Sequence, residues 1–172
     1  SSRPDGSNLM FFLQALEDAG YEHDAPAVQR ALVFLSRIQM DDDINDMTYA
    51  DGSSQGGFIY STSPSGDQVG VGESKAGMIE ETLDEGTTIS RLRSYGSMTY
   101  AGFKAFAYAK FDDDDKRVDA ARRWIQLNYT LEENPGIGLD GFYYYLMVFG
   151  RALSAWGEPV LATTDGDQRW VV

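Results

Sequence analysis

The run Asp112–Asp115 opens the longest unbroken stretch of charged residues in the chain, and a carboxyl group there could act as a proton donor. Such a donor must be kept neutral, which requires a dry, apolar cavity. Lys116 and Arg117 follow directly, and their positive charges would keep the aspartates ionised. Asp114 also stands where the capping residue of a helix belongs, as Asp24 does earlier in the chain. The run therefore predicts a solvated capping group, with proton transfer by Asp112, Asp114 or Asp115 as the alternative.

A second acidic run covers residues 41–46, DDDIND, and has the D-x-D-x-N spacing that opens a calcium-binding EF-hand loop. Its sixth position is Asp46 rather than glycine, and its twelfth is Gly52 rather than glutamate. A zinc site is disfavoured because the chain has no cysteine and a single histidine, His23. No Gly-Lys-Ser/Thr phosphate loop is present. We predict no metal and no cofactor, with a calcium ion at residues 41–46 as the alternative.

The third group of residues that could take part in function is aromatic. Its members recur through two apolar stretches of the second half of the chain: Tyr95, Tyr100, Phe103, Phe106, Tyr143, Tyr144 and Tyr145. Such side chains either fill the space between helices or line a cavity. Buried tyrosines favour a cavity somewhat, because their hydroxyl groups need hydrogen-bond partners. We therefore predict a ligand cavity lined by Tyr95, Tyr100, Phe103, Tyr143, Tyr144 and Tyr145, with core packing as the alternative.

The charge balance narrows the classes of molecule that the protein could bind. The chain has 27 acidic and 14 basic residues, a formal net charge of −13. This excess disfavours nucleic acid and anionic membrane surfaces, since both bind proteins through positive charge. No apolar run approaches the length of about 20 residues that a membrane span needs. No signal peptide is visible in the chain, and its compartment is left open.

The elements that would position these groups are helices, and they repeat. A constant offset of 90 residues aligns the stretch from Ser7 with the stretch from Ser97 without a gap, placing Ala31 on Ala121. In each unit an apolar helix is followed by an amphipathic one. We predict helices at 7–19, 25–39, 95–110, 115–129 and 142–157.

The fold class that follows is all-α, in a single domain over residues 1–172. Repeat units cover about 7–60 and 95–141, and a third unit starts at 142–157. Residues 61–90 are rich in glycine, serine and acids, so we predict an insertion that is mostly loop. Apolar helices should form an inner layer and amphipathic helices an outer layer.

These units resemble the QW-type repeats of the prenyltransferase and squalene oxidase/cyclase superfamily. In that repeat an aromatic residue and a glutamine close the outer helix, and here Gln39 is the glutamine. A Gly-Gly-Phe sequence, here ending in Phe58, then opens the inner helix of the repeat. The second copy has Asn128 in place of the glutamine and Phe142 after Asp-Gly. The stretches LRSYGSMTYAGFKAFAYA and WIQLNYTLEENPG are similar to bacterial members of this group. The resemblance implies a partial α/α toroid.

The resemblance also bears on activity. Protein prenyltransferases of this superfamily bind zinc through Asp, Cys and His, a set that this chain lacks, so zinc-dependent prenylation is disfavoured. Squalene–hopene-type cyclases carry an Asp-x-Asp-Asp acid, which Asp112, Asp114 and Asp115 match by spacing. In those enzymes inner-helix aromatics stabilise carbocations. If the protein is active, a cyclase-like isomerase or a prenyltransferase-like transferase is implied.

Two functions remain. The first is the handling of an isoprenoid- or lipid-like apolar small molecule in an aromatic-lined cavity. The alternative is a non-catalytic repeat module for protein–protein interaction. We also expect apolar surface on the first and last apolar helices, around 9–16 and 143–153. That surface predicts either self-association or contact with the remaining part of a longer chain.

Overall fold

The computed structural model describes residues 4–22, 24–65, 68, 70–109, 111, 114–157 and 160–169. Its elements, in chain order, are helices α1 (Gly6–Asp18) and α2 (Pro26–Arg37), the 3-10 turn η1 (Thr48–Ala50), strands β1 (Met78–Thr82) and β2 (Thr88–Leu92), helices α3 (Gly96–Tyr108), α4 (Lys116–Asn128) and α5 (Phe142–Trp156), and strands β3 (Val160–Thr163) and β4 (Gly166–Arg169). Five helices were predicted from the sequence, and each lies within about two residues of its predicted bounds.

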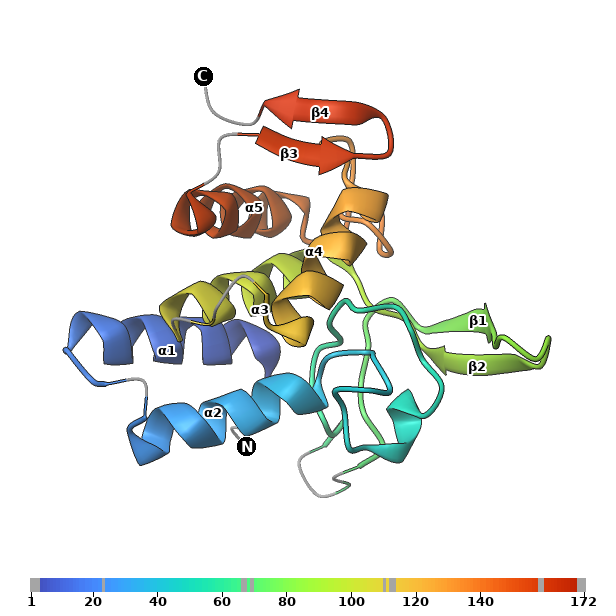
Figure 1. Ribbon diagram of the computed structural model, residues 1–172, viewed down its shortest axis with the longest axis horizontal. Helices are drawn as coiled ribbons and strands as arrows, with labels where there is room; N and C mark the ends of the chain where they lie inside the picture. Colours follow the sequence, from blue (N-terminus) through green and yellow to red (C-terminus); the bar gives the residue numbers. More distant parts are fainter. Residues whose placement is uncertain are drawn as a thin grey trace.

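Helix α3 is the centre of the molecule (Figure 1). It contacts α1 on one side and α5 on the other, while α2 lies against α1 and α4 against α3. All residues from Gly96 to Phe106 are buried, as expected for a helix without a polar flank. On α1, by contrast, Phe11 and Phe12 are 44% and 47% exposed, because none of the described elements covers that flank. Helix α3 is thus covered all round, whereas α1 exposes aromatic residues within the apolar surface predicted around residues 9–16.

The 90-residue offset recurs in the backbone. Helix α3 begins and ends 90 residues after α1, and α4 begins 90 residues after α2. The residues that end α1 and α3, Ala19 and Ala109, have φ/ψ values of −83°/1° and −80°/2°. Each donates its backbone N–H to the carbonyl four residues earlier, in Ala15 and Ala105. The sequence repeat thus predicts that the two helical hairpins, α1–α2 and α3–α4, superpose as wholes.

The expectation of an all-α toroid is wrong, because the described chain also contains two small antiparallel sheets. In the first, β1 pairs with β2, with Met78 opposite Leu92. This hairpin lies within and just beyond residues 61–90, so the predicted insertion contains two short strands as well as loop. In the second, β3 pairs with β4, with Val160 opposite Arg169. The molecule is a small domain of mixed helix and strand.

The chain between α2 and α3 connects the two helical hairpins, α1–α2 and α3–α4. Within this connection, we call residues Gly56–Phe58 the Gly-Gly-Phe segment. It lies in the groove between α3 and α4, where Phe58 is completely buried and its ring meets that of Phe106 edge-on at 5.7 Å. The Phe58 N–H donates to Thr99 Oγ1 at 3.1 Å. Its carbonyl accepts from the Tyr95 N–H at 3.2 Å.

None of the helices in the described ranges combines the length and the hydropathy needed to cross a membrane.

Candidate functional site

A cavity of about 480 Å³ lies where α1, α3 and α5 all begin. We call it the tyrosine cavity. Its wall is formed by three helix starts and by two loops, one before β1 and one before α5: Ser7, Tyr60, Lys75, Tyr95, Ser97, Met98, Asn134, Ile137, Asp140, Gly141 and Tyr144. Its volume falls in the range of about 300–1,000 Å³ that is usual for small-molecule sites.

Two of the three helix starts around the cavity, those of α1 and α3, are held by side chains. Asp5 caps α1, and its carboxylate accepts from the Ser7 hydroxyl at 2.6 Å and from the Asn8 N–H at 2.9 Å. Asn134 caps α3 from the opposite loop, because its Oδ1 accepts from the Ser97 N–H at 2.8 Å. The Asn134 amide also donates to the Ser97 hydroxyl and to the Asp140 carbonyl, each at 3.1 Å. These bonds fix the positions of the polar wall residues.

Two tyrosine hydroxyl groups of this wall are buried without a hydrogen-bond partner among the described residues, those of Tyr95 and Tyr144. Tyr95 is 1% exposed. Burial raises the pKa of Tyr95 far above its ordinary value, and nearby Tyr60, Tyr144, Glu73 and Asp5 raise it further. Burial also raises the pKa of Tyr144, to about 12, although Ser7 opposes the shift. Both hydroxyls therefore stay protonated and remain able to donate a hydrogen bond.

The electrostatic surroundings are acidic. Burial alone would raise the pKa of Asp5, but hydrogen bonds from Ser7, Asn8 and Tyr60 outweigh it and lower this pKa below its usual value. Asp5 is therefore ionised at neutral pH. Among the cavity-lining residues, all of them described, Lys75 is the one cation, and its Nζ lies 4.5 Å from the centre of the Tyr60 ring. The apolar part of the wall comes from Met98, Ile137 and the tyrosine rings.

The structure divides the predicted aromatic residues among three environments. Tyr95 and Tyr144 line the tyrosine cavity. Tyr100 and Tyr145 pack in the core, with ring centres 5.6 Å apart, and Tyr145 donates to the Thr130 carbonyl at 2.7 Å.

The other two cavity candidates lie elsewhere. Phe103 meets the ring of Trp156 edge-on at 5.2 Å and lines a separate cavity of about 200 Å³ between α3, α4 and α5. Tyr143 is 87% exposed to solvent and lines neither of these two cavities. Phe106 packs against Phe58 in the core. Core packing is thus the role of most of this group.

The acidic candidates lie away from the tyrosine cavity. Asp115 is the capping residue of α4, and its carboxylate accepts from the Arg117 N–H at 2.9 Å. Hydrogen bonds from the Arg117 side chain lower the pKa of Asp115 more than burial raises it. Asp114 is exposed, and Asp112 lies outside the described residues. The caps predicted at Asp114 and Asp24 are each wrong by one residue, since α4 is capped by Asp115 and α2 by Ala25.

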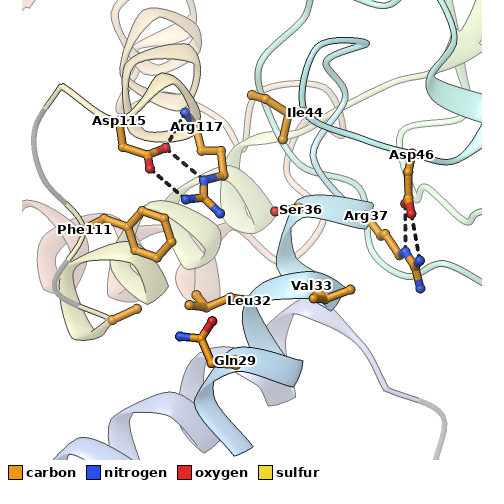
Figure 2. A pocket seen from close by; sticks show the side chains of 11 residues that line it. Gln29, Leu32, Val33, Ser36, Arg37, Ile44, Asp46, Phe111, Asp115 and Arg117 are labelled. Atoms are coloured by element: carbon orange, nitrogen blue, oxygen red, sulfur yellow. Dashed lines mark hydrogen bonds and ion pairs between the residues drawn. The ribbon is translucent and has the colours of Figure 1, made fainter. Parts of the chain in front are cut away.

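Beside Asp115 lies a second cavity, of about 540 Å³, between α2 and the start of α4 (Figure 2). We call it the arginine cleft. On one wall Arg117 forms a two-point ion pair with Asp115 and stacks on the Phe111 ring at 4.0 Å. On the other wall Arg37 forms a two-point ion pair with Asp46. Both guanidinium groups are thus neutralised by carboxylates, which leaves the cleft poorly suited to an anion.

The acidic run at residues 41–46 does not gather into a cation site. Asp46 points to Arg37, and the Asn45 amide donates to the carbonyls of Arg37 and Gln39 at 3.0 and 2.7 Å. Within the part of the chain that the structure describes, no three His, Asp or Glu side chains come together to hold a metal ion. His23 lies outside the described residues.

Sequence reasoning did not single out Ser7, Tyr60, Lys75 or Asn134, all of which line the tyrosine cavity. One signal was available for Asn134, because Asn134-Pro135-Gly136 is a turn sequence whose asparagine commonly bonds to nearby backbone. Tyr60 and Lys75 reach the cavity from irregular segments, and no periodicity marks them.

Comparisons with protein-family models, with curated proteins and with solved structures found no match. The resemblance to the cyclase and prenyltransferase superfamily stays a prediction from the sequence.

Proposed function

We propose that the protein binds an uncharged amphipathic small molecule in the tyrosine cavity and does so without transforming it. The isoprenoid- or lipid-like class of the ligand comes from the sequence resemblance, and an isoprenoid alcohol is its simplest uncharged form. The observation that carries the proposal is the pair of buried tyrosine hydroxyls at the cavity wall, on Tyr95 and Tyr144, which make no hydrogen bond of normal geometry to the described part of the chain.

A buried hydroxyl group without a partner costs about 1–3 kcal/mol of stability. A ligand oxygen between Tyr95 and Tyr144 would remove this cost by accepting a hydrogen bond from each. The raised pKa of both groups supports the role of donor, because a phenol that ionised near neutral pH would instead be an acceptor.

The charge of the wall favours a neutral polar end. Asp5 is ionised next to the cavity, and the carboxylates of Asp5 and Glu73 lie close enough to raise the pKa of Tyr95. Lys75 provides one positive charge at the rim. A diphosphate would meet more negative than positive charge here, whereas an alcohol would meet two donors.

Binding without catalysis is favoured by the positions of the carboxyl groups. A cyclase-like reaction needs a neutral carboxylic acid in a dry cavity. Asp115 is ionised, paired with Arg117, and lines the arginine cleft rather than the tyrosine cavity. Asp5 is held ionised by hydrogen bonds from three residues, Ser7, Asn8 and Tyr60. Neither residue can therefore protonate a ligand in the tyrosine cavity at neutral pH.

The test is a titration of the full chain with farnesol, farnesyl diphosphate and glucose, in which binding is monitored by NMR. We expect farnesol to bind, and the variants Tyr95→Phe and Tyr144→Phe each to weaken it roughly 5-fold, the effect of one hydrogen bond of about 1 kcal/mol. Tyr145→Phe is the matched control, because its hydroxyl bonds to Thr130 outside the cavity, and it should leave farnesol affinity unchanged.

Tighter binding of farnesyl diphosphate than of farnesol would contradict the neutral polar end. Binding of glucose in place of farnesol would contradict the lipid-like part. Equal loss of affinity in all three tyrosine variants would show that the hydroxyls act only through the fold.

A second function, protein–protein interaction, is favoured by a different observation. Phe11 and Phe12 of α1 are about half exposed, and an apolar groove lies beside Phe12.

A further inference from the structure

The flank of the first helical hairpin carries an open apolar groove of about 400 Å³ between α1 and α2. We call it the α1–α2 groove. Its lining is mainly apolar, with Arg30 and the capping Asp5 among the polar members: Pro4, Asp5, Asn8, Leu9, Phe12, Ala27, Arg30, Ala31 and Phe34. It shares only Asp5 with the neighbourhood of the tyrosine cavity and is a separate site.

The second hairpin shows what lies on the equivalent flank. There the groove between α3 and α4 is occupied by the Gly-Gly-Phe segment. A Cβ atom at Gly56 would lie 2.4 Å from the Ala120 carbonyl oxygen, so the backbone of the segment lies directly on α4. Gly57 lies equally close to the Trp124 ring, where a Cβ atom would come within 2.7 Å. Gln39 completes the contact by donating to the Arg117 carbonyl at 2.9 Å.

The 90-residue offset relates the two grooves residue by residue. Phe34 of α2 corresponds to Trp124 of α4, so the outer-helix half keeps an aromatic residue, whereas Arg30 stands at the position of Ala120, against which Gly56 lies. The same register holds for the ends of α1 and α3. The α1–α2 groove is therefore lined by the sequence counterparts of residues that hold an extended, glycine-containing segment in the second hairpin.

The inner-helix half differs at two positions. Leu9 stands where Thr99 accepts the Phe58 N–H, so this hydrogen bond to the segment has no counterpart in the α1–α2 groove. Phe12 stands at the position of Gly102, whose missing side chain makes room for Phe58: a Cβ atom at Gly102 would lie 2.8 Å from the Phe58 ring. The ring of Phe12 thus takes the space that Phe58 fills in the second hairpin. An occupant of the α1–α2 groove has room for a small side chain at this place, but not for a second aromatic ring.

We propose that the α1–α2 groove binds an extended segment of a partner polypeptide that carries Gly-Gly followed by a small apolar residue. This goes beyond the proposed function and does not depend on it, because the ligand is a peptide and the site is a different one.

The test uses two peptides derived from residues 53–61, SSQGGFIYS and its Phe58→Ala form SSQGGAIYS, added to the full chain at up to about 1 mM, where weak binding is detectable. We expect the alanine peptide to shift NMR signals of Ala31 and Phe34, and the phenylalanine peptide to bind at least 5-fold more weakly. In the variant Phe12→Gly this order should reverse, because a socket like that at Gly102 is created.

Two controls separate docking from general effects. Phe11→Gly places the same glycine on the same helix at a similarly exposed residue that does not line the groove, so it should keep the wild-type order. An alanine peptide that also carries Gly56→Ala should not bind, since a Cβ atom there has no room over the helix backbone. If Phe12→Gly does not fold, Phe12→Ala provides the same comparison with a smaller helix cost.

The proposal is overturned if neither peptide shifts groove signals, if the preference is the same in wild type and Phe12 variants, or if the shifts centre on the tyrosine cavity. Farnesol binding is measured separately, so a failure of peptide binding does not affect the test of ligand binding in the tyrosine cavity, and the reverse also holds.

Discussion

At the scale of single residues, the tyrosines of the helical core differ in what their hydroxyl groups do. Tyr145 donates to the Thr130 carbonyl, whereas Tyr95, at nearly the same burial, has no partner among the described residues. The free energy of unfolding should therefore respond in opposite directions when each hydroxyl is removed. This contrast tests the Tyr95 hydroxyl without any ligand.

We expect Tyr95→Phe to raise the free energy of unfolding by about 1 kcal/mol, because it removes an unsatisfied buried group. Tyr145→Phe should lower it by about 1 kcal/mol, because it leaves the Thr130 carbonyl without its donor. Urea denaturation at neutral pH measures both. Equal destabilisation by the two changes would mean that Tyr95 has a partner after all.

The raised pKa of Tyr144 predicts an alkaline loss of stability. In the unfolded chain this phenol ionises near pH 10, but in the folded protein only near pH 12. Between these values the unfolded state releases the proton first, so the contribution to stability is complete below pH 10 and is lost as the pH rises toward 12. Tyr144→Phe should make the decline of the free energy of unfolding shallower in this window. Tyr49, also raised to about 12, accounts for part of what remains.

The candidate site could be predicted only in part. Tyr95 and Tyr144 were identifiable because they open apolar helices, whose starts converge on the cavity. Whether a tyrosine in the same helix faces the core or solvent depends on the neighbours of that helix. Tyr143 and Tyr145 differ from Tyr144 only by the rotation of one residue along α5, and periodicity in an all-apolar stretch does not say which face is covered.

At the scale of elements, the sequence predicts the helices clearly but not the strands. The amphipathic helix α2 shows apolar residues at a spacing of three and four, and the unbroken apolar run of α3 is too long for a strand. In β1 and β2 only one face is half-buried, with residues such as Ile79 and Ile89 separated by charged and polar ones. Five-residue strands of this composition read as loop, because a polar strand is stabilised mainly by its partner strand.

The Gly-Gly-Phe segment gives a prediction at this scale. Gly56 has φ +78° and lies against the α4 backbone, so Gly56→Ala should cost about 3 kcal/mol or more from the backbone clash added to strain. Gly86, in the turn between β1 and β2, has a similar φ of +83° but open space around it.

Gly86→Ala is therefore the matched control and should cost only about 1–2 kcal/mol. Guanidinium denaturation of both variants gives the difference. If the two costs are alike, the close approach of Gly56 to Ala120 contributes nothing beyond its backbone conformation.

At the scale of the whole molecule, apolar edges and net charge oppose each other. Phe11 and Phe12 on α1 and Tyr143 on α5 leave apolar surface at the two ends of the helix layer. The net charge of −13 repels one copy from another. The balance between the two must depend on ionic strength, since salt screens charge but leaves apolar contact in place.

We therefore expect sedimentation velocity to show monomers at about 0.01 M salt, where screening extends over about 30 Å, and association at about 1 M, where it falls to about 3 Å. Tyr143→Lys and Phe11→Lys should each reduce the association at high salt. The exposed Val71→Lys, on a loop away from both edges, is the control and should not. A protein that stays monomeric at both salt concentrations would show that these edges are too small to associate.

Because α3 is central to the fold, α1 is synthesised well before the helix that covers it. The inward face of α1, with Met10 and Leu13 buried in the finished protein, is covered by a helix that begins 90 residues later in the chain. At a translation rate of about 5–20 residues per second, those 90 residues take roughly 5–18 s to be made. During that interval the nascent chain exposes an apolar helix whose partner helix does not yet exist, so α1 offers a binding site to a ribosome-associated chaperone.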